Sequence, residues 1–319
     1  MPRTCTVCKS IITVLIWCFS RAFAQSVPST DRSPQDYTLK LPVDEVVLTF
    51  HASDADGKPV NDIKSSEVRL WDNGNPPRRI VAFDALLDRA LRVGILMDTS
   101  ESMTRTLALN RTIAERYVQR LFRQKSDLAF VEDFGFTSET TQPWSDDPSV
   151  LQRSIRAVRI GRMNPVGGTA IFDEIFRACF YGFAKTNPTA TGNIILLFSD
   201  GEDNAGQTTL QEALRACQRS NTTIYAFLAP SRPGEDSPGP KNLREIASGT
   251  GGRVFSADDS EDAIWDDLTV IESETRNQYR LVYNPAKFKH DGSFHEIEIQ
   301  PPDRVTKVEV RPGYYAPVQ

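Results

Sequence analysis

The chain has 319 residues, of which 25% are charged, and its formal net charge at pH 7 is −5. This length is enough for two domains of about 100–200 residues each. The acidic balance argues against general binding to nucleic acids or to anionic membranes, because both are polyanions.

The first 24 residues have the features of a secretory signal peptide. Arg3 and Lys9 give a basic start, residues 11–19 are apolar but too short to span a bilayer, and Ala22-Phe23-Ala24 is an A-x-A cleavage pattern. The alternative is an uncleaved membrane anchor. We expect an exported protein, in the periplasm, on the outer surface or outside the cell, with no integral membrane span after cleavage. Residues 25–36 are polar with Ser and Pro, and we expect a disordered leader there.

Residues 37–88 have the pattern of short strands separated by turns. Strands are expected at 37–41, 45–52, 68–72 and 79–83, and the pattern returns in residues 279–319 with strands at 279–283, 295–300 and 305–311. Neither flank is large enough for a core of its own. We therefore predict that the two flanks pair into one small antiparallel β-sandwich.

Between the flanks, residues 89–278 alternate between apolar strands and helices. Strands are expected at 93–97, 126–134, 193–198, 222–228 and 253–256, and helices at 107–122, 149–160, 170–186, 208–220, 242–248 and 260–277. This alternation is typical of right-handed crossovers between parallel strands. The predicted fold class is α/β, with a doubly wound, mostly parallel, Rossmann-like sheet inserted in or flanked by the small antiparallel β-sandwich.

Cys179 and Cys217 are the cysteines that remain once the signal peptide is removed. In an exported protein they could form one disulfide, or they could be two buried thiols in helices, and the sequence does not choose between these alternatives. His51, His290 and His295 are scattered, with no CxxC motif nearby, which argues against a zinc site.

Two of the predicted buried strands end in a carboxylate. The apolar run 93–97 is followed directly by Asp98, and the run 193–198 is followed by Ser199 and then Asp200. In an open α/β sheet, ligands bind at the carboxyl ends of the strands, where the strand order reverses. If the two strands are neighbours there, Asp98 and Asp200 lie together.

Hydroxyl side chains accompany these carboxylates. Ser100 and Ser102 follow Asp98 at alternate positions, and Thr169 follows two glycines just before a helix. Two carboxylates and three hydroxyls are suitable ligands for a hard divalent cation, and they leave room for water and one outside ligand. Taken singly, Asp98 and the three hydroxyl residues could be helix N-caps, and Asp200 could belong to a simple turn. Only the set indicates a metal site.

Three motifs at these positions resemble the metal-site motifs of the von Willebrand factor type A (VWA) domain. They are DTSES at 98–102, GGTAIFDE at 167–174 and FSDGEDN at 198–204, and the resemblance covers roughly Arg92 to Gln278. It implies a metal-ion-dependent adhesion site in which Ser100, Ser102 and Thr169 coordinate the ion directly, while Asp98 and Asp200 act directly or through water. It also implies Mg²⁺ or Mn²⁺, with Ca²⁺ less favoured, and a partner carboxylate that completes the shell.

The chain as a whole is similar to exported VWA-related proteins of Acidobacteria. In those proteins DGKPV and a DNG turn, here at 56–60 and 72–74, precede the domain, and a terminal GYYA, here at 313–316, follows it. One departure is Glu101, which stands where many VWA domains have glycine. This third negative charge could weaken acidic ligands or tighten cation binding.

The other acidic residues beside the motifs are expected to be solvated, as is Glu101. They are Asp173, Glu174 and Asp203.

Three functions fit these patterns. The leading hypothesis is an exported, metal-dependent, adhesion-type binding module, not an enzyme, that engages a protein partner presenting Asp or Glu. The alternatives are a Mg²⁺-dependent hydrolase such as a phosphatase, and a structural module in which the metal stiffens the loops. The sequence contains no DxDxT or G-x-S-x-G motif and no histidine near the metal motifs, which argues against the hydrolase.

Overall fold

The computed structural model describes residues 44–163, 167–184, 186, 191–229, 237–256 and 260–318. Contacts divide the chain into Met1–Pro42 and Val43–Gln319, and every described residue belongs to the second unit. The predicted signal peptide, the leader and the strand at 37–41 lie outside the described residues. Within the described ranges, no helix combines the length and the apolar character needed to cross a membrane.

The strands are β1 (Val46–Ser53), β2 (Arg69–Asp72), β3 (Arg79–Leu87), β4 (Leu91–Asp98), β5 (Leu128–Phe134), β6 (Ser138–Ser145), β7 (Gly192–Ser199), β8 (Thr222–Leu228), β9 (Val254–Ser256), β10 (Asn277–Asn284), β11 (Phe294–Gln300), β12 (Lys307–Val310) and β13 (Gly313–Tyr315). The helices are the 3₁₀ helices η1 (Ser65–Glu67) and η2 (Glu101–Arg105), the α-helices α1 (Leu107–Arg120), α2 (Pro148–Ala157), α3 (Ile171–Arg177), α4 (Leu210–Arg219), α5 (Gly239–Gly249) and α6 (Glu261–Arg276), and the π-helix η3 (Ala178–Gly182).

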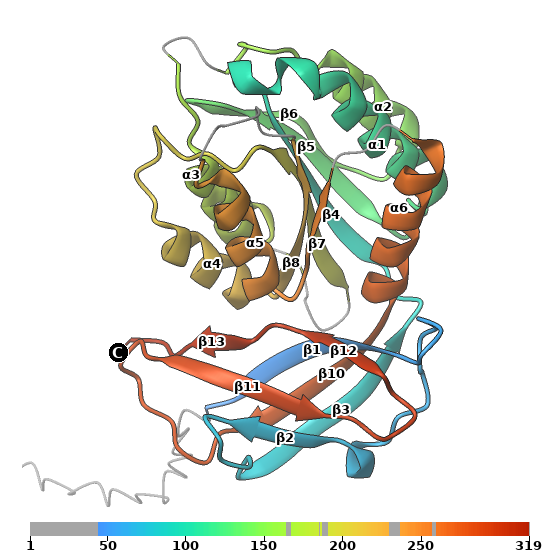
Figure 1. Ribbon diagram of the computed structural model, residues 1–319, viewed down its shortest axis with the longest axis vertical. Coiled ribbons are helices and arrows are strands. Elements are labelled where there is room, and N and C mark those ends of the chain that lie inside the picture. The colour runs from blue at the N-terminus through green and yellow to red at the C-terminus, as the bar shows by residue number, and fades with distance from the viewer. Residues whose placement is uncertain are drawn as a thin grey trace, which may run out of the picture. The chain divides into compact units, whose positions relative to one another are not determined.

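The central sheet has six strands in the order β6-β5-β4-β7-β8-β9 (Figure 1). All neighbouring pairs are parallel except β5 and β6. Helices α1, α2 and α6 pack on one face and α3, α4 and α5 on the other, because successive side chains of the apolar strands point to opposite faces. The predicted doubly wound, mostly parallel α/β fold is confirmed.

Two parts of this sheet region differ from the prediction. Strand β6 was not predicted, because SETTQPWS is polar and contains Pro143, a pattern suited to a solvated edge strand. The helix expected at 170–186 is instead α3 followed by the π-helix η3, and η3 carries Cys179. Of the two alternatives for the cysteines, the structure has the disulfide, Cys179–Cys217, which joins η3 to α4.

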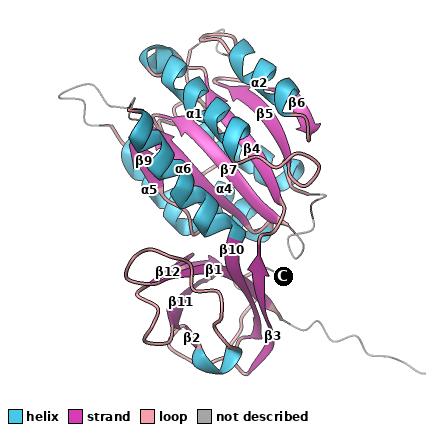
Figure 2. Ribbon diagram, turned by 90° about the vertical axis from the view of Figure 1, so that its right-hand side faces the viewer, coloured by secondary structure: helices cyan, strands magenta, loops and turns pink. Residues whose placement is uncertain are grey.

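The two flanks form antiparallel sheets together. Their strand orders are β12-β1-β10-β3 and β13-β11-β2 (Figures 1 and 2). In the first sheet β1 and β3 from before the α/β region pair with β10 from after it, and in the second sheet β2 pairs with β11. The apolar side chains of these strands share one core, which includes Leu48, Phe50, Tyr279 and Ile297. The antiparallel sheets predicted beside the α/β fold are therefore present.

Asp72 holds the two antiparallel sheets together inside this core. Its Oδ2 accepts hydrogen bonds from the hydroxyls of Tyr283 (2.7 Å) and Tyr314 (2.8 Å), and its Oδ1 lies 2.6 Å from Nδ1 of His295. A buried carboxylate is tolerated when its oxygens are paired in this way. The four residues come from β2, β10, β13 and β11, so the network depends on both flanks.

Asp127 ties the start of the α/β region to its end. This buried residue precedes β5 and accepts the main-chain N–H of Leu91 (2.8 Å), the first residue of β4. It also accepts the main-chain N–H of Arg123 (2.9 Å) and a hydrogen bond from Arg276 Nη2 (2.6 Å). Arg276 ends α6 and donates to the carbonyl of Arg89 (2.9 Å). One buried ion pair thus fixes both connections between the α/β region and the antiparallel strands, the one before β4 and the one after α6.

We expect Asp127→Asn to destabilise the protein by about 3–5 kcal/mol, because it leaves the Arg276 charge buried without a carboxylate. Urea unfolding of the mature chain measures this change. The matched control is Asp266→Asn at an exposed position of α6, which should change the free energy of unfolding by less than about 0.5 kcal/mol. Equal stability of the two variants would contradict the assigned role of Asp127.

Glu274 of α6 is a second buried acid at this junction. Arg253 donates a hydrogen bond to Glu274 and another, of 2.9 Å, to Glu309 of β12. Burial raises the pKa of Glu274 to about 7; the Arg253 charge opposes this rise and the Glu309 charge adds to it. The folded protein therefore binds this proton more tightly than the unfolded chain does.

The stability contributed by Glu274 should be fully present below about pH 4.5 and lost as the pH rises through about 7, by at most about 3 kcal/mol. Urea unfolding at pH 5 and pH 8 should therefore give a smaller difference for Glu274→Gln than for the wild type. Glu245→Gln, exposed on α5, should retain the wild-type difference. The same pH dependence in all three proteins would exclude this titration.

Candidate metal centre

The structure brings Asp98 and Asp200 to the same edge of the sheet. Asp98 is the last residue of β4, and Asp200 follows the last residue of β7, its parallel neighbour. The chain leaves β4 towards β5 on one side and returns to β7 on the other, so this is where the strand order reverses. Ligand sites of open α/β sheets form at this position.

Asp98 is held by neutral hydrogen bonds. Its side chain is 1% exposed; Oδ1 accepts the main-chain N–H of Ser100 (2.8 Å) and Oδ2 accepts the hydroxyl of Ser199 (2.7 Å). Burial raises the pKa of Asp98 to about 6, the hydrogen bonds from Ser100 and Ser199 oppose this rise, and the nearby Asp200 charge adds to it. The dominant charged neighbour of Asp98 is therefore another acid.

The two serine hydroxyls of the first motif converge. Ser100 Oγ and Ser102 Oγ lie 3.0 Å apart, with Ser100 buried and Ser102 exposed. Ser100 precedes η2, but its side chain makes no capping hydrogen bond to that helix. Helix capping therefore does not account for Ser100, and its hydroxyl is available to a cation together with that of Ser102.

Thr169 is tied to the loop that follows Asp200. Its main-chain N–H donates to Asn204 Oδ1 (2.7 Å), and its carbonyl accepts the main-chain N–H groups of Asn204 (3.0 Å) and Ala205 (3.1 Å). The N-cap of α3 is Ala170, so the buried Thr169 does not cap that helix. Gly168 has a φ of +95°, and a Cβ there would lie 2.9 Å from Cβ of Ala205, so the close loop contact needs glycine.

Asp200 begins a turn that packs tightly against α5. Its Oδ1 accepts the main-chain N–H of Glu202 (3.1 Å), and the hydroxyl of Ser199 accepts the N–H of Gly201 (3.0 Å). Gly201 has a φ of +84°, and a Cβ there would lie 2.2 Å from the carbonyl oxygen of Gly239. The turn expected at this position is present, and its backbone position is fixed by α5.

The expectation that the neighbouring acids are solvated holds for Glu101 and is wrong for Glu174. Glu101 is exposed, whereas Glu174 is 2% exposed and pairs with Arg177 at 2.9 Å. Arg177 also pairs with Glu132 of β5 at 2.7 Å, and burial together with the Glu132 charge raises the pKa of Glu174. Glu174 lies on the sheet-facing side of α3, and its acidic neighbour Glu132 comes from a strand far away in the sequence.

Asp173 and Asp203 are also engaged rather than free in solvent. Asp173 accepts the main-chain N–H of Thr208 (2.7 Å), and Asp203 accepts that of Phe172 (3.3 Å). Both are partly buried, and they cross-link the start of α3 to the loop after Asp200. Their carboxylates therefore support the geometry of the loops that carry Thr169 and Asp200.

The donor set fits a hard divalent cation. Among the described residues, no Lys, Arg or His nitrogen forms an ion pair with Asp98 or Asp200. The part of the chain that the structure describes has no group of three or more His, Cys, Asp or Glu that could hold a metal. A cation at this edge would therefore depend on the two carboxylates together with the hydroxyls of Ser100, Ser102 and Thr169.

Sequence reasoning missed two residues that position the site, Ser199 and Asn204. Ser199 joins Asp98 to the turn at Gly201, and Asn204 joins the Thr169 loop to the loop after Asp200. Both lie within the motif FSDGEDN. A polar residue directly before a strand-terminal Asp is the signal that could have indicated Ser199.

We expect Ser199→Ala to weaken Mg²⁺ or Mn²⁺ binding by about tenfold or more, because it removes a hydrogen bond that orients Asp98. Titration calorimetry measures the affinity. The control is Ser248→Ala, an exposed serine on α5. An unchanged affinity in Ser199→Ala, with the fold intact by circular dichroism, would exclude this positioning role.

These observations define a doubly wound α/β domain with an acidic, hydroxyl-rich site where its strand order reverses. The von Willebrand factor type A domain matches residues 93–269, more than half of the chain, and the chain belongs to this family. No curated protein matches the chain significantly. The similarity to acidobacterial proteins stays a prediction, because none of these matches tests it.

Several solved structures resemble this chain at low sequence identity. BatB from Bacteroides thetaiotaomicron is 19% identical over 57% of this chain and 97% of its own, with a TM-score of 0.45. An aerotolerance-related membrane protein from Bacteroides fragilis is 17% identical over 57% of this chain and 98% of its own (TM-score 0.46). Proximal thread matrix protein 1 from the mussel byssus, with a zinc-occupied MIDAS motif, is 16% identical over 65% of this chain and 50% of its own (TM-score 0.50). At 16% identity, the likeness to the mussel protein concerns the fold alone.

Proposed function

We propose that this chain is a metal-dependent, adhesion-type binding module. A divalent cation binds between the loops after β4 and β7, and an Asp or Glu carboxylate of a protein partner completes its coordination. The observation that carries this proposal is the pair of neighbouring acids, Asp98 and Asp200, which have no cationic partner among the described residues. VWA domains typically mediate metal-dependent protein interactions, which supports the same function.

The proposed roles follow from burial and position. Ser100, Ser102 and Thr169 coordinate the cation directly, and Asp98 and Asp200 act directly or through water. Two carboxylates balance the charge of the cation, but a third carboxylate from a partner still gains from direct coordination. Ser102 and Glu101 are exposed, which supports a site that a partner can reach from solvent.

The proposed cation is Mg²⁺ or Mn²⁺. The donors are all oxygen, which is the ligand type that these ions prefer, and Ca²⁺ usually takes more oxygen ligands than this site offers. The mussel protein has zinc in its motif. Zinc usually takes nitrogen or sulfur ligands, and neither His nor Cys occurs in the three motifs of this chain.

We propose a binding function rather than catalysis. His51 and His295 lie in strands β1 and β11 of the antiparallel sheets, and His290 pairs with Asp44 at 3.1 Å. None of them is in the loops that carry Asp98, Thr169 and Asp200. The site loops therefore offer no imidazole as a general base, and the proposal assigns their carboxylates and hydroxyls to the cation.

We also propose that the protein is exported. The signal-peptide features of the first 24 residues support export, and so does the Cys179–Cys217 disulfide, because such bonds persist in oxidising compartments. The periplasm, the outer surface and the medium all satisfy this condition.

Calorimetric titration of the mature protein with Mg²⁺ and Mn²⁺ tests the cation site. Asp98→Asn and Asp200→Asn should each lose affinity by more than about tenfold, because each removes a negative charge from the site. Asp262→Asn, on the exposed side of α6, should bind as the wild type does. Wild-type affinity in both site variants would end the metal-site proposal.

Pull-down from cell-envelope extract, with and without EDTA, separates the three functions. Partner capture that requires the cation and Asp200 supports the binding module. Phosphate-ester turnover that requires the same aspartates would replace it with the hydrolase. A cation that raises the melting temperature without partner capture or turnover would favour the structural module.

A further inference from the structure

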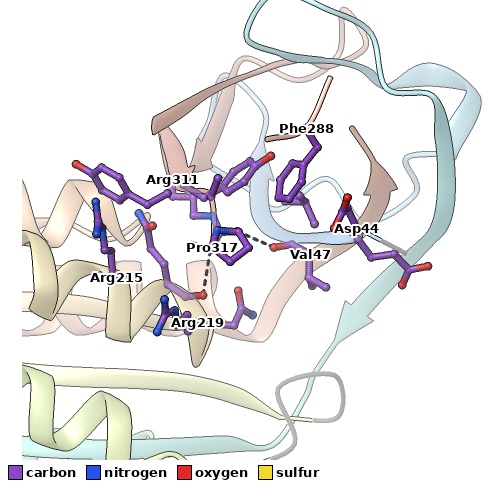
Figure 3. Close-up of a pocket in the computed structure, with 14 residues that line it drawn as sticks. Asp44, Val47, Arg215, Arg219, Phe288, Arg311 and Pro317 are labelled. Carbon is purple, nitrogen blue, oxygen red and sulfur yellow. Dashed lines mark hydrogen bonds between the residues drawn. The ribbon is translucent and has the colours of Figure 1, made fainter. Parts of the chain in front are cut away.

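A pocket of about 390 Å³ lies away from the metal edge. Its wall is formed by α4, the start of β1 and the C-terminal strands (Figure 3). This volume is within the range of small-molecule sites, about 300–1,000 Å³. None of the three VWA motifs contributes to it, so its chemistry is independent of the cation.

Three arginines line the pocket without an acidic partner. Arg215 and Arg219 come from α4, and Arg311 lies between β12 and β13. Among the described residues, none of them has a carboxylate oxygen within ion-pair distance. Elsewhere in the fold the buried arginine Arg276 is paired with Asp127, whereas these three guanidinium groups have no such partner.

Arg311 is the most deeply placed of the three. Its side chain is 9% exposed; Nη2 donates to the carbonyl of Val47 (2.8 Å) and Nη1 to that of Gln218 (3.3 Å), while Nε has no partner among the described residues. All of its acceptors are neutral, and its guanidinium carbon lies 5.9 Å from the centre of the Tyr314 ring, so no carboxylate balances its positive charge. Burial lowers the pKa of Arg311 to about 10, which still leaves it charged at neutral pH. A buried uncompensated charge is costly unless an anion accompanies it.

The rest of the wall offers flat aromatic surfaces. The Phe288 and Tyr314 rings lie nearly parallel, at 20° with centroids 6.4 Å apart. The guanidinium carbon of Arg215 lies 4.5 Å from the centre of the Tyr315 ring. The Tyr314 hydroxyl is bound to Asp72, so this residue presents its ring to the pocket. Such surfaces favour a planar apolar group.

Two acids also line the pocket and limit the charge of a ligand. Asp44 and Glu45 directly precede β1, so the pocket lining has two formal negative charges against the three arginines. The excess of one positive charge matches a monoanion better than a polyphosphate.

We propose that this pocket binds a small aromatic monocarboxylate, with its carboxylate at the arginines and its ring against Phe288 and Tyr314. A free aromatic acid and the C-terminal Phe of a peptide present the same chemistry, and both sources are tested below.

Titration of the mature protein in EDTA with 2-naphthoate is the first test, since EDTA removes any contribution of the cation site. We expect binding at micromolar to millimolar concentration, as is usual for a ligand of this size, on the order of a dozen non-hydrogen atoms. 2-Naphthalenemethanol keeps the ring without the charge, and acetate keeps the charge without the ring. Each should bind at least about tenfold more weakly than 2-naphthoate.

The variant Arg215→Gln/Arg219→Gln leaves Arg311 in place and should weaken 2-naphthoate binding by about tenfold or more. Arg244→Gln, at an exposed position on α5, is the matched control and should bind as the wild type does. No 2-naphthoate binding up to about 5 mM would overturn the proposal, as would equal binding of the alcohol or wild-type affinity in the double variant.

The peptide Ala-Ala-Phe and its C-terminal amide form the second arm. Tighter binding of the peptide acid than of 2-naphthoate, with loss in the amide, supports a peptide terminus as the source. Tighter binding of 2-naphthoate supports a free acid. If both peptides and 2-naphthoate fail to bind, the pocket is not a carboxylate site.

Discussion

The buried ion pair between Asp127 and Arg276 is the interaction on which this architecture depends. The α/β region is inserted between strands that pair with each other, so its first strand and its last helix must begin and end close together. Asp127 meets both, through the main-chain N–H of Leu91 and the guanidinium of Arg276. Because both partners are almost fully buried, the pair has the geometry and the low local dielectric in which loss of one member is costly.

At the opposite edge of the same sheet, a second buried aspartate is stabilised by different partners. There Asp98 is equally buried, but it is held by a main-chain N–H and a serine hydroxyl rather than by an arginine. Its neighbour Asp200 adds charge instead of removing it. At one edge the protein supplies the cation from its own chain, and at the other we propose that it takes the cation from solution. The first edge fixes the fold, and in this proposal the second is left open to a partner.

Much of the fold and the candidate site is predictable from local patterns. Apolar runs that end at Asp98 and near Asp200 indicate buried strands and their shared edge, and both are present. Strand β6 escapes prediction because its polar sequence is shaped by an edge position and not by burial. The burial of Glu174 is not predictable from local sequence, because Glu132, the acid beside it, lies 42 residues earlier in the chain. The position of Arg311 in the pocket wall is not predictable either, because its acceptor Val47 lies 264 residues away. The disulfide could not be chosen because it depends on how η3 packs against α4.

The pairing of β3 with β10 has a mechanical consequence. These strands lead into and out of the α/β region at the same end, where Leu87 lies opposite Asn277. A pull on the α/β region therefore loads both strands along their length at once, instead of peeling one from the other. The two strands are pulled in the same direction, so the load falls on their ladders with other strands, and the β1–β10 ladder from Val46 to Phe50 would have to slide as a whole before β1 and β10 separate. Force borne by a bound partner would thus meet many hydrogen bonds in shear rather than one at a time.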